Sequence, residues 1–355
     1  MNEKLLMSGN HIIGEAAVRA GCRFYAGYPI TPQNELTEYM ASAMARLNDG
    51  TFIQAESEIA AINMVIGASM AGCRAMTSSS SPGISLKQEG ISFLAALELP
   101  AVIVNCMRGG PGLGNIAPSQ GDYFQATRGG GHGDYRTIVL APGSGQEIAD
   151  LTRKAFEYAD KYRTPVMILQ DGMMGQMMEP AIFPDPVDTA GLPPKPWTLD
   201  GADGRPSRII KSLLLDPLVE EALCWRLVAR YEEMAKEIQA AESFMTSDAD
   251  LAVIAYGTAA RIAKGAVKRA RQKGMKVGLF RPITLWPFPK DSLLEINKHI
   301  KNFLVFEMST GQMVEDVRLS LEGAGKVHFY GRPGGPISTP QEIEGEIKKV
   351  FESKV

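Results

Sequence analysis

The sequence predicts an α/β protein with two units, a larger one built on a parallel sheet covered by helices on both faces and a smaller one that follows it. Two observations support this prediction. Short apolar runs alternate with longer amphipathic segments from the start of the chain to about residue 183, and the alternation resumes near residue 248. Continuous apolar runs are typical of parallel strands, because the crossover helices bury both faces of the sheet.

The first unit is expected to span residues 1–183. Its buried strands are expected at Arg23–Tyr28, Thr51–Gln54, Arg74–Thr77, Ala101–Met107, Thr137–Leu140 and Pro165–Gln170. Its helices are expected near Gln33–Arg46, Ser57–Ala71, Gly83–Leu97 and Gln146–Tyr162. Local signals agree with these limits, since Ser81 and Pro82 suit the N-cap and the first residue of a helix.

Residues 184–247 are expected to form a linker arm and an amphipathic helix. The stretch Pro184–Pro217 is rich in Pro, Gly and Asp and lacks hydrophobic periodicity. Apolar residues then recur at helical spacing up to about Ala241. They are Leu223, Leu227, Tyr231, Met234 and Ile238. This stripe fits packing against its own domain, and it also fits packing against another chain.

The second unit is expected to span residues 248–355, the size of one ordinary domain. Its strands are expected at Leu251–Tyr256, Lys276–Phe280, Phe303–Phe306 and Lys326–Tyr330. Its helices are expected near Ala259–Gln272, Val314–Leu321 and Gln341–Phe351.

The composition argues against several classes of function. The 355 residues include 37 Lys and Arg against 40 Asp and Glu, a net charge of -3. Such balance gives no general attraction for nucleic acid or an anionic membrane. Gly9–His11 interrupt the N-terminal apolar run, so it does not resemble a signal peptide, and no segment approaches the roughly 20 apolar residues of a membrane span. We expect a cytoplasmic protein that binds neither nucleic acid nor membranes.

The cysteines indicate no metal site within this chain. Cys22, Cys73, Cys106 and Cys224 form no C-x-x-C pair of the kind that holds zinc or an iron–sulfur cluster. Scattered thiols are typical of a reducing compartment. We expect this chain alone to hold no metal ion and no iron–sulfur cluster.

The first candidate site motif surrounds a threonine. Tyr28-Pro29-Ile30-Thr31-Pro32 directly follows the first expected strand. The prolines restrict the backbone around the Thr31 hydroxyl. Open α/β sheets bind ligands at the carboxyl ends of their strands, where this loop is expected. The same residues also fit a stiff turn before a helix.

The second motif places an arginine at the end of a strand. Arg108 follows Ala101–Met107 and suits bidentate binding of a carboxylate. Gly112 and Gly114 in the next loop permit close approach of the backbone to a ligand. The spacing matches neither a Walker A loop nor a G-x-G-x-x-G turn that opens a helix. In a later glycine-rich stretch, His132 fits a ligand contact and a mobile surface loop equally well.

The third motif holds two acids, Glu56 and Glu58, where an expected strand turns into a helix. Acids in a first helical turn often serve as caps or partners of the helix dipole. Alternatively, one carboxyl group is held against a cofactor by a tightly packed helix, which Ala60, Ala61 and Gly67 would permit.

Together these motifs resemble those of alpha-type subunits of 2-oxoacid:ferredoxin oxidoreductases, over nearly the whole chain. The branch that acts on 2-oxoisovalerate (3-methyl-2-oxobutanoate) is the most similar. In chain order, with the number of the first residue, the motifs are Y-P-I-T-P (28), A-E-S-E-I-A-A-I-N-M (55), S-S-P-G-I-S-L-K-Q-E-G (80), M-R-G-G-P-G-L-G (107), G-G-H-G-D-Y (130), D-G-M-M-G-Q-M-M-E-P (171), R-P-I-T-L-W-P-F-P (281) and E-M-S-T-G-Q-M (307).

The resemblance implies a thiamine diphosphate-binding fold with a pyrimidine-type domain, followed by a transketolase C-terminal-like domain. It also implies a reaction, the oxidative decarboxylation of a 2-oxo acid with coenzyme A as acyl acceptor and ferredoxin as electron acceptor. A beta-type subunit would hold the diphosphate, its magnesium and an iron–sulfur cluster. A gamma-type subunit and a ferredoxin-like subunit or ferredoxin would be further partners. The sequence agrees, since it has no G-D-G motif followed by a distant Asn.

The resemblance also implies roles for single residues. Glu56, with Glu58 as the second choice, would hydrogen-bond the aminopyrimidine and favour its imino tautomer. Thr31 and Arg108 would bind the substrate carboxylate. Pro29, Gly112, Gly114 and His132 are weaker candidates for cofactor contacts. Alternatives remain open: 2-oxoglutarate or pyruvate as substrate, a non-catalytic scaffold that keeps the fold, another kind of thiamine enzyme, and a phosphate-binding module.

Overall fold

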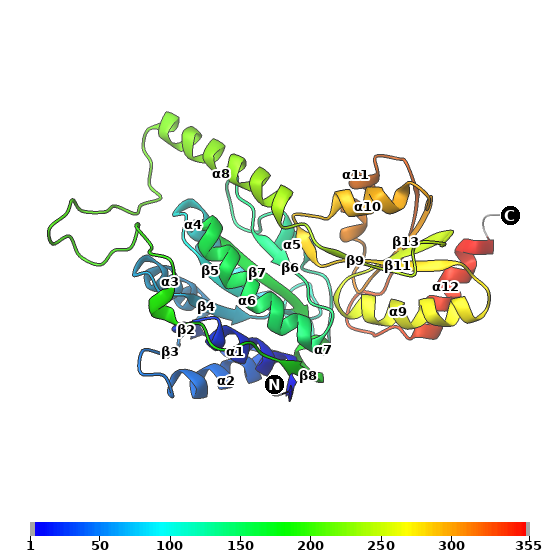
Figure 1. Cartoon of the computed structure of the whole chain (residues 1–355), viewed down its shortest axis with the longest axis horizontal. Coiled ribbons are helices and arrows are strands. Elements are labelled where there is room, and N and C mark those ends of the chain that lie inside the picture. Colours follow the sequence, from blue (N-terminus) through cyan, green and yellow to red (C-terminus); the bar gives the residue numbers. More distant parts are fainter. Residues whose placement is uncertain (1–3, 353–355) are drawn as a thin grey trace.

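The computed structural model describes residues 4–352 and contains a larger and a smaller α/β unit (Figure 1). Seven strands form the larger sheet. Their order is β12-β6-β7-β5-β4-β2-β3, and every neighbouring pair is parallel except β12 with β6. The six strands from the first half are β2 (Phe24–Gly27), β3 (Thr51–Gln54), β4 (Ala75–Ser79), β5 (Ala101–Met107), β6 (Ile138–Leu140) and β7 (Pro165–Asp171). The predicted parallel sheet is therefore confirmed.

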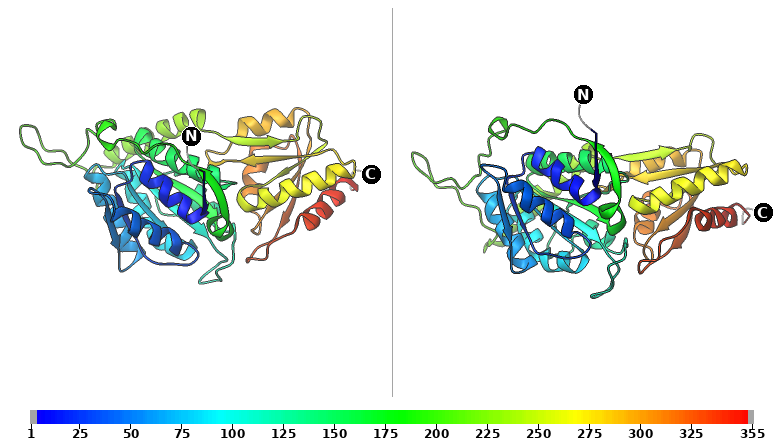
Figure 2. Two further views of the ribbon diagram at one scale, coloured as in Figure 1. Left: turned by 60° about the horizontal axis from the view of Figure 1, so that its bottom comes forward. Right: turned by 90° about the horizontal axis from the view of Figure 1, so that it is seen from below.

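Helices cover both faces of this sheet (Figures 1 and 2). Those helices are α1 (Gly9–Arg19), α2 (Asn34–Met44), α3 (Glu58–Met70), α4 (Ser81–Ala96) and α6 (Gly145–Tyr162). Ile103 of β5 packs in the cluster that contains α3 and α4, whereas Val102 and Val104 pack in the cluster that contains α1, α2 and α6. Successive side chains of a strand point to opposite faces, so a strand buried on both sides must be apolar throughout.

The N-terminal elements were not predicted. β1 (Lys4–Ser8) pairs antiparallel with β8 (Met178–Ile182) as a separate two-stranded sheet, and α1 follows directly. Helix α1 buries only two large apolar side chains, Ile12 and Ile13, and otherwise packs through small residues such as Gly14, Ala16 and Ala17. A Cβ added at Gly14 would lie 2.4 Å from Tyr39 Cδ1. Such packing leaves little periodic hydrophobic signal in the sequence.

The second sheet contains the four strands expected in the smaller unit and one more. Its order is β14-β13-β10-β11-β9, with only β9 antiparallel to its neighbour. The strands are β9 (Ala241–Phe244), β10 (Leu251–Ile254), β11 (Val277–Pro282), β13 (Asn302–Glu307) and β14 (Lys326–Gly331). The helices of this unit are α9 (Gly257–Gln272), α10 (Lys290–Asn297), α11 (Met313–Leu321) and α12 (Pro340–Glu352).

Between the units, an extended arm projects from the body of the molecule before α8 (Pro217–Glu237) begins (Figures 1 and 2). The five apolar residues predicted to form a stripe on this helix are all buried against the chain's own core. Own-chain packing therefore accounts for the stripe. Among the described residues, no helix combines the length and apolar character needed to cross a membrane.

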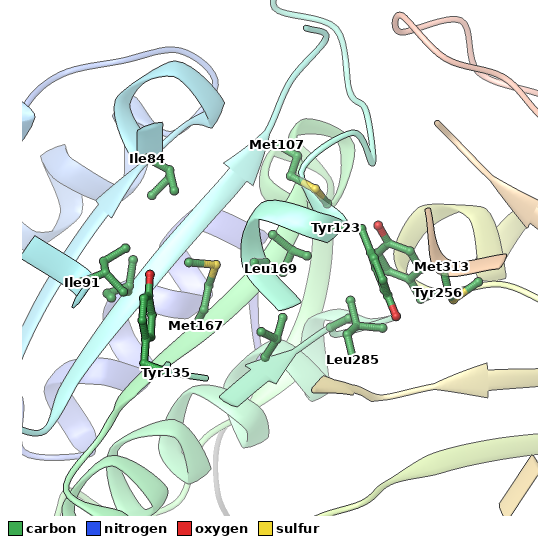
Figure 3. Packing of buried hydrophobic residues seen from close by; sticks show 14 of the residues in the cluster. Ile84, Ile91, Met107, Tyr123, Tyr135, Met167, Leu169, Tyr256, Leu285 and Met313 are labelled. Atoms are coloured by element: carbon green, nitrogen blue, oxygen red, sulfur yellow. The ribbon is translucent and has the colours of Figure 1, made fainter. Parts of the chain in front are cut away.

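The two units are joined by more than the arm. Strand β12 (Thr284–Trp286) comes from the second half of the chain but adds to the edge of the larger sheet, where Trp286 pairs with Val139. Tyr123 packs against Tyr256 of the second unit, with ring centroids 5.8 Å apart (Figure 3). The buried Asp171 accepts a hydrogen bond of 2.8 Å from the Thr258 hydroxyl at the start of α9.

Candidate functional site at the carboxyl edge of the larger sheet

The carboxyl ends of five parallel strands meet along one edge of the larger sheet. The predicted motifs follow these strands. The loop 28–32 follows β2, the two acids follow β3, and Arg108 follows β5. Ser80 follows β4, and the D-G-M-M-G motif begins at the last residue of β7. The parallel topology therefore gathers residues that are far apart in sequence, as expected for a ligand site in an open α/β sheet.

Arg108 and the Thr31 loop are in direct contact. Arg108 Nη1 donates a hydrogen bond of 3.0 Å to the Thr31 carbonyl oxygen, and Nη2 donates one of 3.1 Å to the Leu113 carbonyl oxygen. The Thr31 hydroxyl accepts a hydrogen bond of 3.4 Å from the Asn34 amide. The structure thus brings the two predicted substrate-binding residues together and leaves the Thr31 hydroxyl free to donate a further bond.

The charge of Arg108 is buried without a counter-charge. Its exposed fraction is 7%, and it forms no ion pair with a carboxylate of residues 4–352. Its Nε is buried and has no hydrogen-bond partner among these residues. A buried cation without an anion carries a desolvation cost, and an anionic ligand would offset that cost.

Asn10, which the sequence reasoning missed, fixes the position of the Thr31 loop. Its amide nitrogen donates 2.9 Å to the Pro32 carbonyl oxygen and 3.0 Å to Glu35 Oε2. Its amide oxygen accepts 3.1 Å from Gln170 and 3.3 Å from the thiol of Cys106. One fully buried side chain therefore links the loop to β5 and β7. Nothing in the local sequence around Asn10 signals these distant partners.

A second polar cluster contacts the backbone of Arg108. The Ser81 hydroxyl lies 3.0 Å from the Arg108 backbone nitrogen, whose hydrogen bond it accepts, and it donates 2.5 Å to Asp122 Oδ2. Asn105 donates 3.0 Å to the same carboxylate oxygen. Burial raises the pKa of Asp122, and its hydrogen bonds with Ser81 and Asn105 oppose this shift. The cluster holds the end of β5 against the start of α4.

The two candidate acids have different surroundings. Ser57 is the N-cap of α3, and its hydroxyl accepts a hydrogen bond of 3.1 Å from the Ala60 backbone nitrogen. Glu56 precedes the cap and is exposed, whereas Glu58 is the first residue of the helix and only 5% exposed. Ser57, rather than either acid, therefore caps α3, and Glu58 turns into the protein.

The Glu58 carboxylate lies beside the start of α4. A Cβ added at Gly83 would lie 2.4 Å from Glu58 Oε1 and 2.0 Å from Ser79 Oγ, so only glycine leaves room for both groups. The carboxylate accepts no hydrogen bond from residues 4–352. The hydroxyls of Ser79 and Ser80 are buried and also lack partners within the described chain. Buried polar groups left unsatisfied in a native fold call for an explanation, and a ligand is one.

The loop after Arg108 reaches the second unit. Gly114 has a positive φ of 58°, and a Cβ there would lie 1.7 Å from the Gly109 carbonyl oxygen, so the turn requires glycine. Gly112 has a positive φ of 68° and faces open space. Asn115 donates 2.9 Å to the Gly334 carbonyl oxygen of the second unit. Both predicted glycines therefore shape a loop that lies between Arg108 and the other unit.

The two remaining predicted residues lie on the surface. Pro29 is exposed beside Thr31 at the same edge of the sheet. His132 is exposed elsewhere, where its carbonyl oxygen accepts 2.8 Å from Ser92 in the last turns of α4 and its ring lies near Phe93 and α8. The structure does not bring His132 to Thr31 and Arg108. Residues 4–352 contain no group of three or more His, Cys, Asp or Glu side chains placed to hold a metal ion.

Two family models match the chain. One is described as "Pyruvate flavodoxin/ferredoxin oxidoreductase, thiamine diP-bdg" and matches residues 15–202. The other is described as "Pyruvate:ferredoxin oxidoreductase core domain II" and matches residues 249–343. The first model covers the sheet edge that carries the candidate site.

Relatives match over nearly the whole chain. The chain is 47% identical over 345 residues to ketoisovalerate oxidoreductase subunit VorB of Methanothermobacter thermautotrophicus, covering 97% of each chain. It is 38% identical over 376 residues to 2-oxoglutarate synthase subunit KorA of the same organism, covering 99% of this chain and 100% of that one.

Solved structures match as well. The 2-oxoglutarate:ferredoxin oxidoreductase of Magnetococcus marinus, solved with 2-oxoglutarate, coenzyme A and succinyl-CoA bound, matches with a TM-score of 0.86 and 27% identity. That match covers 98% of this chain and 65% of the other, so this chain is similar to a part of that longer polypeptide. A split-gene transketolase matches with a TM-score of 0.59 at 14% identity, which shows a shared fold alone.

Proposed function

This chain belongs to the 2-oxoacid:ferredoxin oxidoreductase family, and from that premise we propose that it supplies the pyrimidine side of a thiamine diphosphate site shared with a partner subunit. The reaction would be the coenzyme A-dependent oxidative decarboxylation of a 2-oxo acid. Bound thiamine diphosphate would supply the carbanion that attacks the keto carbon. The chain's own residues would bind the substrate, orient the aminopyrimidine and exclude water.

The buried, unpaired Arg108 beside Thr31 is the observation that carries this proposal. A 2-oxo acid has one fixed negative charge, and the guanidinium at the end of β5 is a cation without a carboxylate partner in residues 4–352. We expect Arg108 to bind the substrate carboxylate through Nε and a reoriented Nη, with the Thr31 hydroxyl as a second donor. The Asn10 bond to the Pro32 carbonyl would keep this loop in place when the ligand binds.

Glu58 is our first choice for the carboxyl group that hydrogen-bonds the aminopyrimidine, ahead of Glu56. A proton-sharing carboxyl group works best when water is excluded and its position is fixed. Glu58 is buried, accepts no hydrogen bond within the described chain, and lies next to the unpartnered Ser79 hydroxyl. Glu56 is exposed and becomes the candidate only if a partner subunit covers it. These unpartnered groups fit a cofactor ring that would supply hydrogen-bond donors at this edge of the sheet.

A branched, apolar substrate such as 2-oxoisovalerate is the expected one. The loop beside Arg108 carries two large apolar side chains that face outward, Leu113 at 81% and Ile116 at 64% exposure. Such side chains suit an aliphatic substrate tail better than the second carboxylate of 2-oxoglutarate. The higher identity to the ketoisovalerate subunit than to the 2-oxoglutarate subunit agrees with this choice.

The partners proposed are a beta-type subunit that holds the diphosphate, magnesium and an iron–sulfur cluster, a gamma-type subunit, and a ferredoxin-like subunit or ferredoxin. Coenzyme A would be the second substrate. We also propose a cytoplasmic location, since the four cysteines are free thiols, as is usual in a reducing compartment.

Co-purification with the partner subunits tests the proposal. The complex is assayed for reduction of ferredoxin or a dye with 2-oxoisovalerate, phenylpyruvate, pyruvate and 2-oxoglutarate, each with coenzyme A. We expect the highest kcat/KM for 2-oxoisovalerate. A preference for 2-oxoglutarate would overturn the substrate assignment, and a complex that oxidises none of the four would favour a scaffold role.

Two matched variants of that complex decide between the acids. Glu58→Gln should remove turnover while Glu56→Gln leaves it within about threefold, because a buried carboxylate, shielded from water, would share a proton with the ring better than an exposed one. The reverse pattern would return the role to Glu56. Unchanged activity in both variants would refute the pyrimidine-side proposal.

A further inference from the structure

Lys87 of α4 is an ammonium group buried behind the candidate site. It is 0% exposed, and it is among the largest side chains that the fold buries completely. Its Nζ donates 3.0 Å to the Thr77 hydroxyl of β4 and 3.4 Å to the backbone carbonyl oxygen of Glu58. Lysine is rarely buried in this way unless it is paired, because its charge must leave water.

No carboxylate of residues 4–352 forms an ion pair with Lys87. The charge that acts on it electrostatically is that of Glu58. Burial lowers the pKa of Lys87 to about 8, and the negative charge of Glu58 opposes that shift. Lys87 therefore interacts with Glu58 in two ways, through a backbone hydrogen bond and through space, without bonding the carboxylate oxygens.

The geometry suggests why the carboxylate oxygens stay free. Lys87 lies one helical turn after Gly83 on α4, and Gly83 leaves the space that Glu58 Oε1 occupies beside Ser79. A lysine bonded directly to the carboxylate would neutralise it and compete with a ligand. A lysine bonded to the backbone of the same residue fixes the first turn of α3 and leaves the carboxylate available.

We propose that Lys87 is a positioning residue for Glu58: it anchors the first turn of α3 through the Glu58 carbonyl and leaves the buried carboxylate free for a ligand donor. This inference rests on the proposed function, in which that ligand is the aminopyrimidine of thiamine diphosphate. A methionine would fill the same space without the desolvation cost, so a purely structural role would not require an ammonium group.

The test uses the co-purified complex with four single variants, Lys87→Gln, Lys87→Arg, Thr77→Val and Glu58→Gln, and the double variant Glu58→Gln/Lys87→Gln. Glutamine keeps a donor but removes the charge, arginine keeps the charge, and Thr77→Val removes the 3.0 Å hydrogen bond while leaving the charge in place. The readouts are the rate at which the thiazolium C2 proton exchanges with deuterium, followed by acid quench and NMR, and the Kd for thiamine diphosphate. The KM for the 2-oxo acid is measured alongside them.

We expect Lys87→Gln to slow C2 exchange at least tenfold with the KM for the 2-oxo acid unchanged. Lys87→Arg and Thr77→Val should stay within about threefold of the wild type. The double variant Glu58→Gln/Lys87→Gln should be no slower than Glu58→Gln alone, because Lys87 acts through Glu58. Wild-type exchange in Lys87→Gln, or an additional loss in the double variant, overturns the inference.

The outcomes separate this inference from the proposed function. Wild-type exchange in Glu58→Gln would mean that the role of Glu58 itself is wrong. If Lys87→Gln fails to co-purify, the double variant decides, since a neutral amide at position 58 no longer needs the ammonium and assembly should return. A double variant that also fails to assemble would make Lys87 a structural residue and refute the inference.

Discussion

Two buried arginines show how differently the same side chain is used in this molecule. Arg108 and Arg281 each lie at or next to the carboxyl end of a parallel strand, and their exposed fractions are 7% and 5%. Arg281 donates to both oxygens of Glu147, at 2.8 and 2.5 Å, and to Glu242 at 2.8 Å. Arg108 donates only to backbone carbonyl oxygens and to no carboxylate of the described residues.

The difference fits a structural role for Arg281 and the proposed binding role for Arg108. Burial by itself would lower the pKa of Arg281, but the carboxylates of Glu147 and Glu242 outweigh it and raise that pKa. Its charge is thereby neutralised within the fold, and it joins the two units of the chain. Arg108 is left with its charge uncompensated, so the fold tolerates a cost that a bound anion would relieve.

The largest expected effect is on substrate binding. Arg108→Met in the assembled complex should lower kcat/KM for the 2-oxo acid by about 30- to 150-fold, from the loss of about 2–3 kcal/mol of charge-assisted hydrogen bonding. The change should appear mainly in KM, as measured by steady-state kinetics. A wild-type KM in Arg108→Met would mean that Arg108 does not bind the substrate. The proposed difference in role between Arg108 and Arg281 would then be wrong.

The free energy of unfolding should depend on Arg281 more than on Arg108. Arg281→Met leaves the partly exposed carboxylates of Glu147 and Glu242 without their shared partner, which should cost about 2 kcal/mol of unfolding free energy after allowance for solvent screening. Arg108→Met should change it by much less, because no carboxylate loses a partner. Urea unfolding of both variants measures the difference, and equal losses would show that Arg108 is structural too.

The smallest expected effect is on the pH dependence of stability. Burial alone would raise the pKa of Glu242, but Lys264 and Arg281 hold it below its usual value. A carboxyl group whose pKa is lower in the folded than in the unfolded chain stabilises the fold above about pH 4.3, and the stabilisation is lost as the pH falls through the folded value. The stability gap between wild type and Arg281→Met should therefore narrow between pH 7 and pH 3. The gap for Arg108→Met should show no such narrowing.

Much of the site was predictable because it follows from topology. Apolar runs predict the parallel strands, and the residues just after each run lie at the carboxyl edge of the sheet, where ligands bind. Thr31 and Arg108, predicted in this way, are in contact in the structure. The sequence could not show that Arg281, also preceded by an apolar run, is neutralised by Glu147, which lies 134 residues away. An arginine at the end of a strand predicts a binding site for an anion. Whether its charge is left for a ligand depends on carboxylates that are distant in sequence.

The local chemistry of the acids was less readable. Glu56 and Glu58 are two residues apart at a strand-to-helix junction, and which one turns inward depends on whether Ser57 is the N-cap of the helix. The hydrogen bond that the Ala60 backbone nitrogen donates to the Ser57 hydroxyl fixes the start of the helix. Asn10 and Lys87 were missed for a related reason, since their partners lie on other elements. Buried polar residues show no periodic pattern until the packing is known.

Strand β12 has a consequence for how this polypeptide is made. The outer edge of the larger sheet stays open at β6 until residues 284–286 have left the ribosome, although every other strand of that sheet has emerged more than a hundred residues earlier. A nascent chain cut or stalled within that interval would present an unprotected strand edge, the feature that leads to aggregation. Separate synthesis of the two halves is therefore expected to yield a poorly soluble first half unless its missing strand is supplied.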